Sequence, residues 1–164
     1  MTTRLALPVV LVALAMASLV GGSLKVVIVL LGLLLWDRFA IVTRAATQQL
    51  RDAEFIAAAQ ALGASTRYIL LRELLPNLMS ALTVVATLEM AHAILLEATL
   101  SFLGLGIQPP TPSWGGMIHE GREYLDSAWW ISTFPGLVLM ATSLVVSRTG
   151  DALRDLLDPT LRGA

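Results

Sequence analysis

The sequence contains no cysteine, and only 14% of its 164 residues are charged. The lack of cysteine excludes disulfides, thiolate metal sites and cysteine nucleophiles. A charged fraction so far below the roughly 25% of soluble domains cannot cover the surface of a water-soluble globule. The net charge is −1, so no excess of basic residues exists for nucleic acid, and no nucleic-acid partner is expected. Since 56% of the residues are hydrophobic, disorder is excluded too, and we expect an integral membrane protein.

Motifs for catalysis are absent as well. The chain has no GxxxxGK[ST] loop, whose backbone and lysine hold nucleotide phosphates, so any ATP must be bound by another chain. The two histidines, His92 and His119, are far apart and do not occur in an HExxH pattern, which argues against zinc. We therefore predict no catalytic residue, no metal site and no cofactor.

Long apolar stretches predict an all-α, polytopic transmembrane helix bundle with about four spans, because about 20 apolar residues cross a bilayer. The predicted spans cover residues 5–22, 25–43, 78–103 and 127–147. The second is long enough only if its helix continues past Trp36 through Asp37 and Arg38. The fourth contains Pro135, which membrane helices tolerate better than soluble ones.

The distribution of basic residues predicts the orientation. Nine of the eleven Lys and Arg residues fall on one side of a four-span arrangement: Arg4, Arg38, Arg44, Arg51, Arg67, Arg72, Arg148, Arg154 and Arg162. The positive-inside rule makes that side cytoplasmic, together with both termini and the loop of residues 44–77. Residues 104–126 then form an outer loop. The first segment has an alternative interpretation as a signal peptide, since Arg4 precedes an apolar stretch and residues 15–17 read Ala-Met-Ala.

The cytoplasmic loop of residues 44–77 is predicted to fold into two short helices. Asp52 is placed to cap the first helix and Gly63 to end it in a left-handed conformation. Ser65 is placed to cap the second helix, which Pro76 would end. Small alanine side chains between these points permit a close approach to a partner protein. A helical hairpin lying on the membrane surface is the alternative.

The third predicted span carries polar residues along one side. Projected on a helix, the following fall within an arc of roughly 100°: Ser80, Thr83, Thr87, Glu97 and Ser101. They could line a solute pathway. Alternatively, the hydroxyls bond to their own backbone and Glu97 braces the bundle, which we favour because acids inside a membrane usually have partners. Glu89 and His92, three residues apart, are expected to form a local pair.

Three segments of the chain resemble the permease subunits of ABC importers. Residues 54–65, with residues 74–77, resemble the EAA loop of these permeases. Residues 97–106 and 109–115, and then residues 150–159, resemble the branch that transports dipeptides, oligopeptides and nickel. The resemblance covers nearly the whole chain and keeps the order and spacing of the motifs. It makes residues 1–164 the C-terminal part of a permease domain in a bacterial-type inner membrane.

The resemblance also implies a mechanism and partners. In that family the EAA loop docks on separate ABC ATPase subunits, and the permease pairs with a second permease subunit in the lipid bilayer. An extracytoplasmic solute-binding protein delivers the solute. The chain would then be no enzyme itself, because ATP hydrolysis occurs on the ATPase. The ATPase-coupling residues expected here are Glu54, Ala58, Ala59, Ala61, Gly63, Ala64, Ser65 and Pro76, and the pathway or bundle-brace residues are Glu97, Thr83, Thr87 and Ser101.

The chain also departs from the family pattern. Its first span corresponds to the family's third helix, so the family's N-terminal spans have no counterpart before Met1. The usual EAA glutamate is replaced by Ala57. These departures keep a truncated, non-transporting remnant open as an alternative. A secondary transporter driven by an ion gradient is a further alternative, although Glu89, His92 and Glu97 share one helix where such transporters use several.

Overall fold

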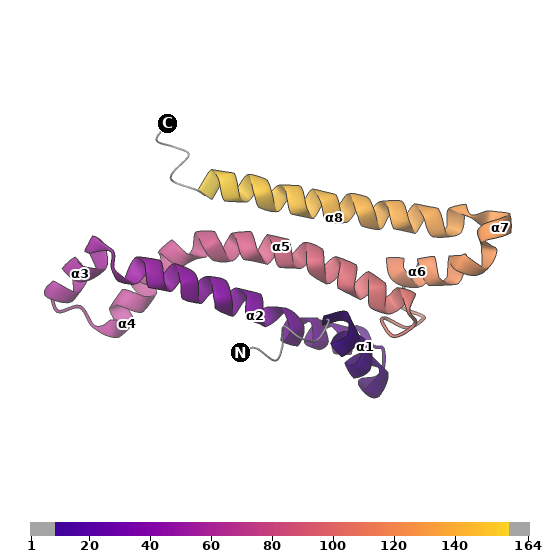
Figure 1. The fold of residues 1–164 in the computed structure, drawn as a ribbon, viewed down its shortest axis with the longest axis horizontal. Helices are drawn as coiled ribbons and strands as arrows, with labels where there is room; N and C mark the ends of the chain where they lie inside the picture. Colours follow the sequence, from indigo (N-terminus) through magenta and orange to yellow (C-terminus); the bar gives the residue numbers. More distant parts are fainter. Residues whose placement is uncertain (1–8, 158–164) are drawn as a thin grey trace. The chain divides into compact units, whose positions relative to one another are not determined.

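The computed structural model describes residues 9–157, and within them it contains helices and no strand (Figure 1). The longer helices are α1 (Val9–Val20), α2 (Leu24–Arg51), α5 (Leu75–Phe102) and α8 (Trp130–Leu157). The shorter elements are α3 (Glu54–Ala61), α4 (Thr66–Tyr68), the π-helical segment Ile69–Leu74, α6 (Trp114–Gly121), the 3-10 turn Arg122–Tyr124 and α7 (Leu125–Ala128). The all-α prediction is confirmed.

Three helical stretches are long and apolar enough to cross a membrane: Leu24–Arg51, Thr66–Phe102 and Trp130–Leu156. At most 11% of their most apolar windows is buried within the structure, so most of these apolar side chains face outward, as lipid contact requires. Helix α1 has 12 residues and is shorter than a full span. Because residues 1–8 lie outside the described residues, the predicted total of about four spans stays a prediction.

The chain divides into two compact units, each with its own apolar cluster. Unit 1 comprises residues 9–36 and 89–146, and unit 2 comprises residues 37–88 and 147–157. In unit 1, the small side chains of Ala13 and Ala17 let α1 pack closely against Leu30 and Leu100. In unit 2, Ile56 packs with Leu74 and Leu78.

Pro76 does not end a helix, contrary to the sequence-based prediction. The chain is helical without a break from Thr66 to Phe102, and Pro76 lies near the start of α5. The π-helical segment just before the proline explains this, because its wider turns already depart from the α-helical bonding that proline would disrupt. The Leu75 amide donates to the Leu70 carbonyl, five residues back, and the Asn77 side chain donates to the Glu73 carbonyl at 2.6 Å.

The predicted cap at Asp52 is also wrong. Helix α2 continues to Arg51, which leaves only two residues before α3, and Ala53 takes the capping position without a side-chain hydrogen bond. The other two local predictions are confirmed. Gly63 has a φ of 77°, and the Ser65 hydroxyl accepts a hydrogen bond from the Tyr68 amide at 3.3 Å.

Candidate functional site

A compact helical hairpin, residues 53–74 of unit 2, contains most of the predicted coupling residues. Its bend is a Schellman motif: the Gly63 amide donates to the Gln60 carbonyl at 2.9 Å and the Ala64 amide to the Ala59 carbonyl at 3.0 Å. The left-handed φ of Gly63 makes this motif possible, since a side chain there would meet the following carbonyl oxygen. The turn between α3 and the following helix is therefore fixed by the backbone.

The hairpin has a buried side and an exposed side. Ile56 is 3% exposed and packs against the start of α5, together with Leu50 from the end of α2. On the other side, Glu54, Ala58 and Ala61 are exposed. Ala59 and Ala64 are half-buried, and Ser65 and Pro76 are exposed.

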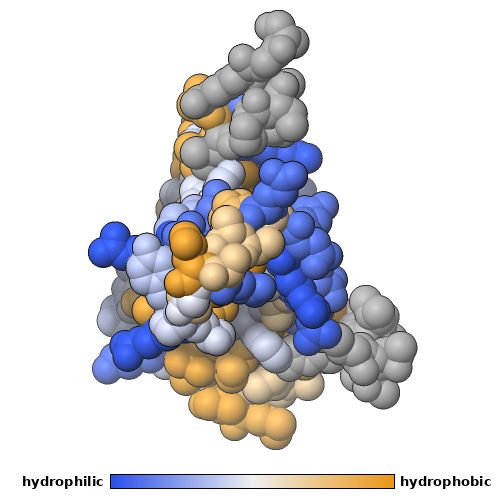
Figure 2. Space-filling model, turned by 90° about the vertical axis from the view of Figure 1, so that its left-hand side faces the viewer, coloured by the Kyte–Doolittle hydropathy of each residue, from blue (hydrophilic) through white to orange (hydrophobic). Residues whose placement is uncertain are grey.

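The tip of the hairpin is apolar as well as exposed. Leu62, next to the bend, is 88% exposed, more than any other large hydrophobic residue described. Phe55, at the start of α3, is also exposed. Figure 2, which looks onto the end of the molecule where α3 and α4 lie, shows hydrophilic and hydrophobic residues side by side. Exposed apolar side chains next to small alanines and flanking charges are typical of a surface that contacts another molecule.

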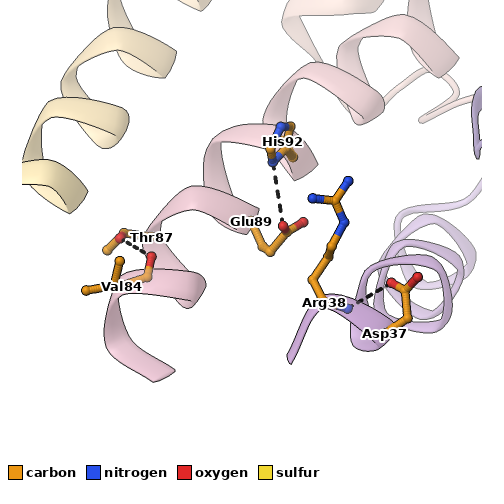
Figure 3. Close-up of polar contacts among 6 residues, drawn as sticks. All are labelled: Asp37, Arg38, Val84, Thr87, Glu89 and His92. Atoms are coloured by element: carbon orange, nitrogen blue, oxygen red, sulfur yellow. Dashed lines mark hydrogen bonds and ion pairs between the residues drawn. The ribbon is translucent and has the colours of Figure 1, made fainter. Parts of the chain in front are cut away.

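The polar residues of the third predicted span are divided between the two units. Thr83 and Thr87, in unit 2, bond to their own helix. The Thr83 hydroxyl donates to the Met79 carbonyl at 2.7 Å. The Thr87 hydroxyl donates to the Val84 carbonyl at 2.8 Å (Figure 3). A Cβ added at Gly150 of α8 would lie 2.9 Å from the Cβ of Thr87, so the two helices pack tightly there. Thr87 is thus part of a helix–helix contact.

Glu97 and Ser101, in unit 1, form a small hydrogen-bond network with the loop after α5. The Ser101 hydroxyl, whose residue is 4% exposed, donates to Glu97 Oε1 at 2.6 Å. The Ser101 hydroxyl oxygen also accepts a hydrogen bond from the Ile107 amide at 3.0 Å. The carboxylate therefore holds, through Ser101, the loop that follows its own helix.

Close packing and further hydrogen bonds fix this loop and α6. The imidazole Nδ1 of His119 lies 2.6 Å from the Phe102 carbonyl, and the Ser113 hydroxyl caps α6 by accepting from the Gly116 amide at 3.1 Å. A Cβ at Gly115 would lie 2.8 Å from two backbone carbons of Ala98. Sequence reasoning missed these roles of His119 and Gly115, although the Ser-x-x-Gly cap of α6 was a usable signal.

A pocket of about 350 Å³ lies between the end of α5, this loop and α6. Its lining consists of Glu97, Ile107, Pro112, Ser113, Trp114 and Met117. This pocket could not be predicted from the sequence, because its lining comes from three different segments of the chain. Glu97 is its one charged lining residue.

Glu89 and His92 form the expected local pair, with His92 Nδ1 3.7 Å from Glu89 Oε1 (Figure 3). Glu89 is 7% exposed, whereas His92 is exposed. Figure 3 also shows Asp37, whose carboxylate accepts from the Arg38 amide at 2.9 Å within the continuous helix α2. Among residues 9–157, no group of three or more His, Asp or Glu side chains could hold a metal ion.

Long apolar helices with outward-facing side chains are typical of a multi-pass helical membrane protein. The hairpin between α2 and α5 is the feature that the EAA loop of transport permeases resembles. The family model described as the inner membrane component of binding-protein-dependent transport systems matches residues 1–163. The chain belongs to this family.

Two curated relatives are similar over nearly the whole chain. The di/tripeptide transport system permease protein DppC of Pseudomonas aeruginosa (strain UCBPP-PA14) is 39% identical over 164 residues, which is 100% of this chain and 54% of the relative. The glutathione transport system permease protein GsiD of Escherichia coli O1:K1 / APEC is 39% identical over 158 residues, which is 96% of this chain and 52% of the relative. The chain thus spans about half the length of the curated relatives it matches.

Proposed function

We propose that this chain acts as a permease subunit of an ATP-driven ABC importer for peptides. The names of its relatives, which are permeases for dipeptides, tripeptides and glutathione, support this substrate class. In this proposal the chain itself hydrolyses nothing, and it works with ABC ATPases, a second permease subunit and an extracytoplasmic solute-binding protein.

The exposed hairpin of residues 53–74 is the observation that carries the proposal. Its bend is fixed by Gly63, its exposed side presents Ala58 and Ala61, and its tip presents Leu62. A rigid knob with small side chains can seat in a groove of a second protein with little loss of conformational entropy. We infer that an ABC ATPase supplies this groove.

The helix that leaves the hairpin supplies the mechanical link. Because the chain is helical from Thr66 to Phe102, a displacement of the hairpin by the closing ATPases would be carried directly into a membrane-spanning helix. The exposed Pro76 lies at the join between the hairpin and α5. In this view the coupling residues are a docking surface and not catalysts.

Co-purification of the partner ATPase with the complete transporter tests the docking role. Gly63→Val, which forces a β-branched residue into left-handed geometry, and Ala59→Trp, which adds bulk to the packed face, should each abolish association while membrane insertion persists. Gly32→Val, at an exposed position of α2 with open space around it, is the matched control and should bind normally. Ala57→Glu should be tolerated or should strengthen binding. Undiminished binding by both bulky variants would contradict the docking role and favour the alternative, a hairpin that lies on the membrane surface.

The proposed orientation, with both termini and the hairpin in the cytoplasm, has a separate test. Cysteines placed at Lys25 and Ser113 should react with a membrane-impermeant thiol reagent in intact cells, because the proposed orientation puts both positions on the outer side. A cysteine at Gln60 should react only after the membrane is permeabilised. Labelling at Gln60 but not at Ser113 in intact cells would reverse the orientation.

A further inference from the structure

The pocket of unit 1 combines one carboxylate with apolar walls. Glu97 supplies the carboxylate, and Ile107, Pro112, Trp114 and Met117 supply most of the remaining surface. Ser101 donates to Oε1 of the carboxylate, and among residues 9–157 no Lys, Arg or His forms an ion pair with it. A carboxylate next to apolar surface is costly unless a cation compensates it. Glu97 therefore offers this pocket a carboxylate that a positively charged ligand could pair with.

The size and the chemistry of the pocket narrow the class of that cation. About 350 Å³ lies within the range of small-molecule sites, about 300–1,000 Å³. A divalent metal would need several oxygen ligands, whereas the lining offers one carboxylate and one hydroxyl. An organic ammonium group suits a single carboxylate, and an indole such as that of Trp114 attracts cations as well. The remaining apolar wall suits a hydrocarbon substituent next to the ammonium group.

The geometry points to this pocket as a binding site for the terminal ammonium group of a peptide whose first residue has an apolar side chain. The ammonium group pairs with Glu97, and the apolar side chain packs on Trp114 and Met117. This assignment rests on the proposed function, because it takes peptides as the transported solutes. The network of Ser101 with the Ile107 amide holds both the carboxylate and the pocket wall in place.

Direct binding to the purified chain in phosphatidylcholine nanodiscs tests the site without any ATPase or solute-binding protein. The probe is tritiated L-phenylalaninamide, and the competitor N-acetyl-L-phenylalaninamide has the same ring but no positive charge. We expect the charged compound to bind about tenfold or more tightly, as expected for a charge-assisted contact. Equal binding of the two compounds would overturn the proposal.

Variants locate the site. Glu97→Gln should erase the preference for the charged compound, whereas Glu123→Gln, the same change at an exposed acid outside the pocket, should keep it. Met117→Arg retains the carboxylate but offers it an internal guanidinium, so it should block binding even if Glu97→Gln folds poorly. A preference that survives both Glu97→Gln and Met117→Arg would place the binding elsewhere.

Two further arms separate the alternatives. Phosphatidylethanolamine carries the same primary ammonium group, so the titration is repeated in nanodiscs that contain it. Unchanged affinity supports a peptide ligand, whereas a loss of affinity identifies the lipid headgroup as the occupant and overturns the peptide assignment. ATP-dependent peptide uptake by the complete transporter is measured separately. Uptake without binding to the pocket would contradict only the assignment of the pocket. Binding without uptake would contradict only the proposed function as a peptide permease.

Discussion

The hairpin of residues 53–74 lies between α2 and α5, and the loop and α6 of residues 103–121 lie between α5 and α8, yet the two regions are held in different ways. The hairpin depends on a backbone motif at Gly63 and on one serine cap, and it leaves alanines and Leu62 exposed. The loop is held by side chains that bond to its backbone and by glycines that pack against α5. The hairpin thus leaves apolar surface exposed, as the proposed docking on an ATPase requires, whereas the loop packs against α5 and lines a pocket.

The largest effect is expected where the loop packs most closely. Gly115→Ala would place a methyl group against the Ala98 backbone, where two carbons already lie 2.8 Å from the ideal Cβ position. We expect a loss of about 2–3 kcal/mol, the usual cost of overpacking a tight contact, measured as a lower midpoint of thermal unfolding in detergent. Gly32→Ala has open space and should cost nothing. Equal melting of the two variants would show that the loop is not tightly packed.

The hydrogen-bond network of the loop should matter somewhat less. Ser101→Ala removes the donor to Glu97 and the acceptor of the Ile107 amide, so we expect a loss of about 1–3 kcal/mol. Hydrogen exchange at the Ile107 amide should accelerate in parallel. Thr99→Val is the control, since the Thr99 hydroxyl bonds only to the Leu95 carbonyl of its own helix. An unchanged exchange rate at Ile107 would remove Ser101 from the support of the loop.

In the hairpin, a substitution at the bend should destabilise the hairpin without destabilising the rest of the protein. Gly63→Val at a φ of 77° should cost about 1–2 kcal/mol, confined to the hairpin. Amide exchange at Gly63 and Ala64 should rise, with no shift of the global unfolding midpoint. Gly63→Asn should be milder, because asparagine tolerates left-handed geometry. If Gly63→Val lowered the global unfolding midpoint as much as Gly115→Ala, the two regions would not differ in how they are held.

The smallest effect is expected at the cap of the second hairpin helix. Ser65→Ala removes the acceptor of the Tyr68 amide and should cost about 1 kcal/mol. Faster exchange at the Tyr68 amide is the measurement. Ser65→Asp restores an acceptor at the same position and should recover protection, so failure of that rescue would contradict a capping role.

Sequence reasoning succeeded where the cause of a structure is local. Gly63 and Ser65 were placed correctly because a left-handed bend and a serine cap depend on a few adjacent residues. The pair of Glu89 and His92 was predictable for the same reason. The errors at Asp52 and Pro76 arose because the helices on either side extend further than their local signals suggest. A π-helical segment absorbs the proline, and no simple sequence signal predicts such a segment.

The sequence by itself determined the all-α class, the membrane environment and the resemblance to a permease family. The first two follow from the ratio of apolar to charged residues and from the length of the apolar stretches. The resemblance follows from short motifs that can be compared without knowing any distant contact. The tertiary structure alone decided that Ser101 connects Glu97 to the loop, that Gly115 packs on Ala98 and that six residues line a pocket. The reason is physical: helix formation and membrane partitioning depend on composition and short periods, whereas a pocket depends on which remote side chains pack together.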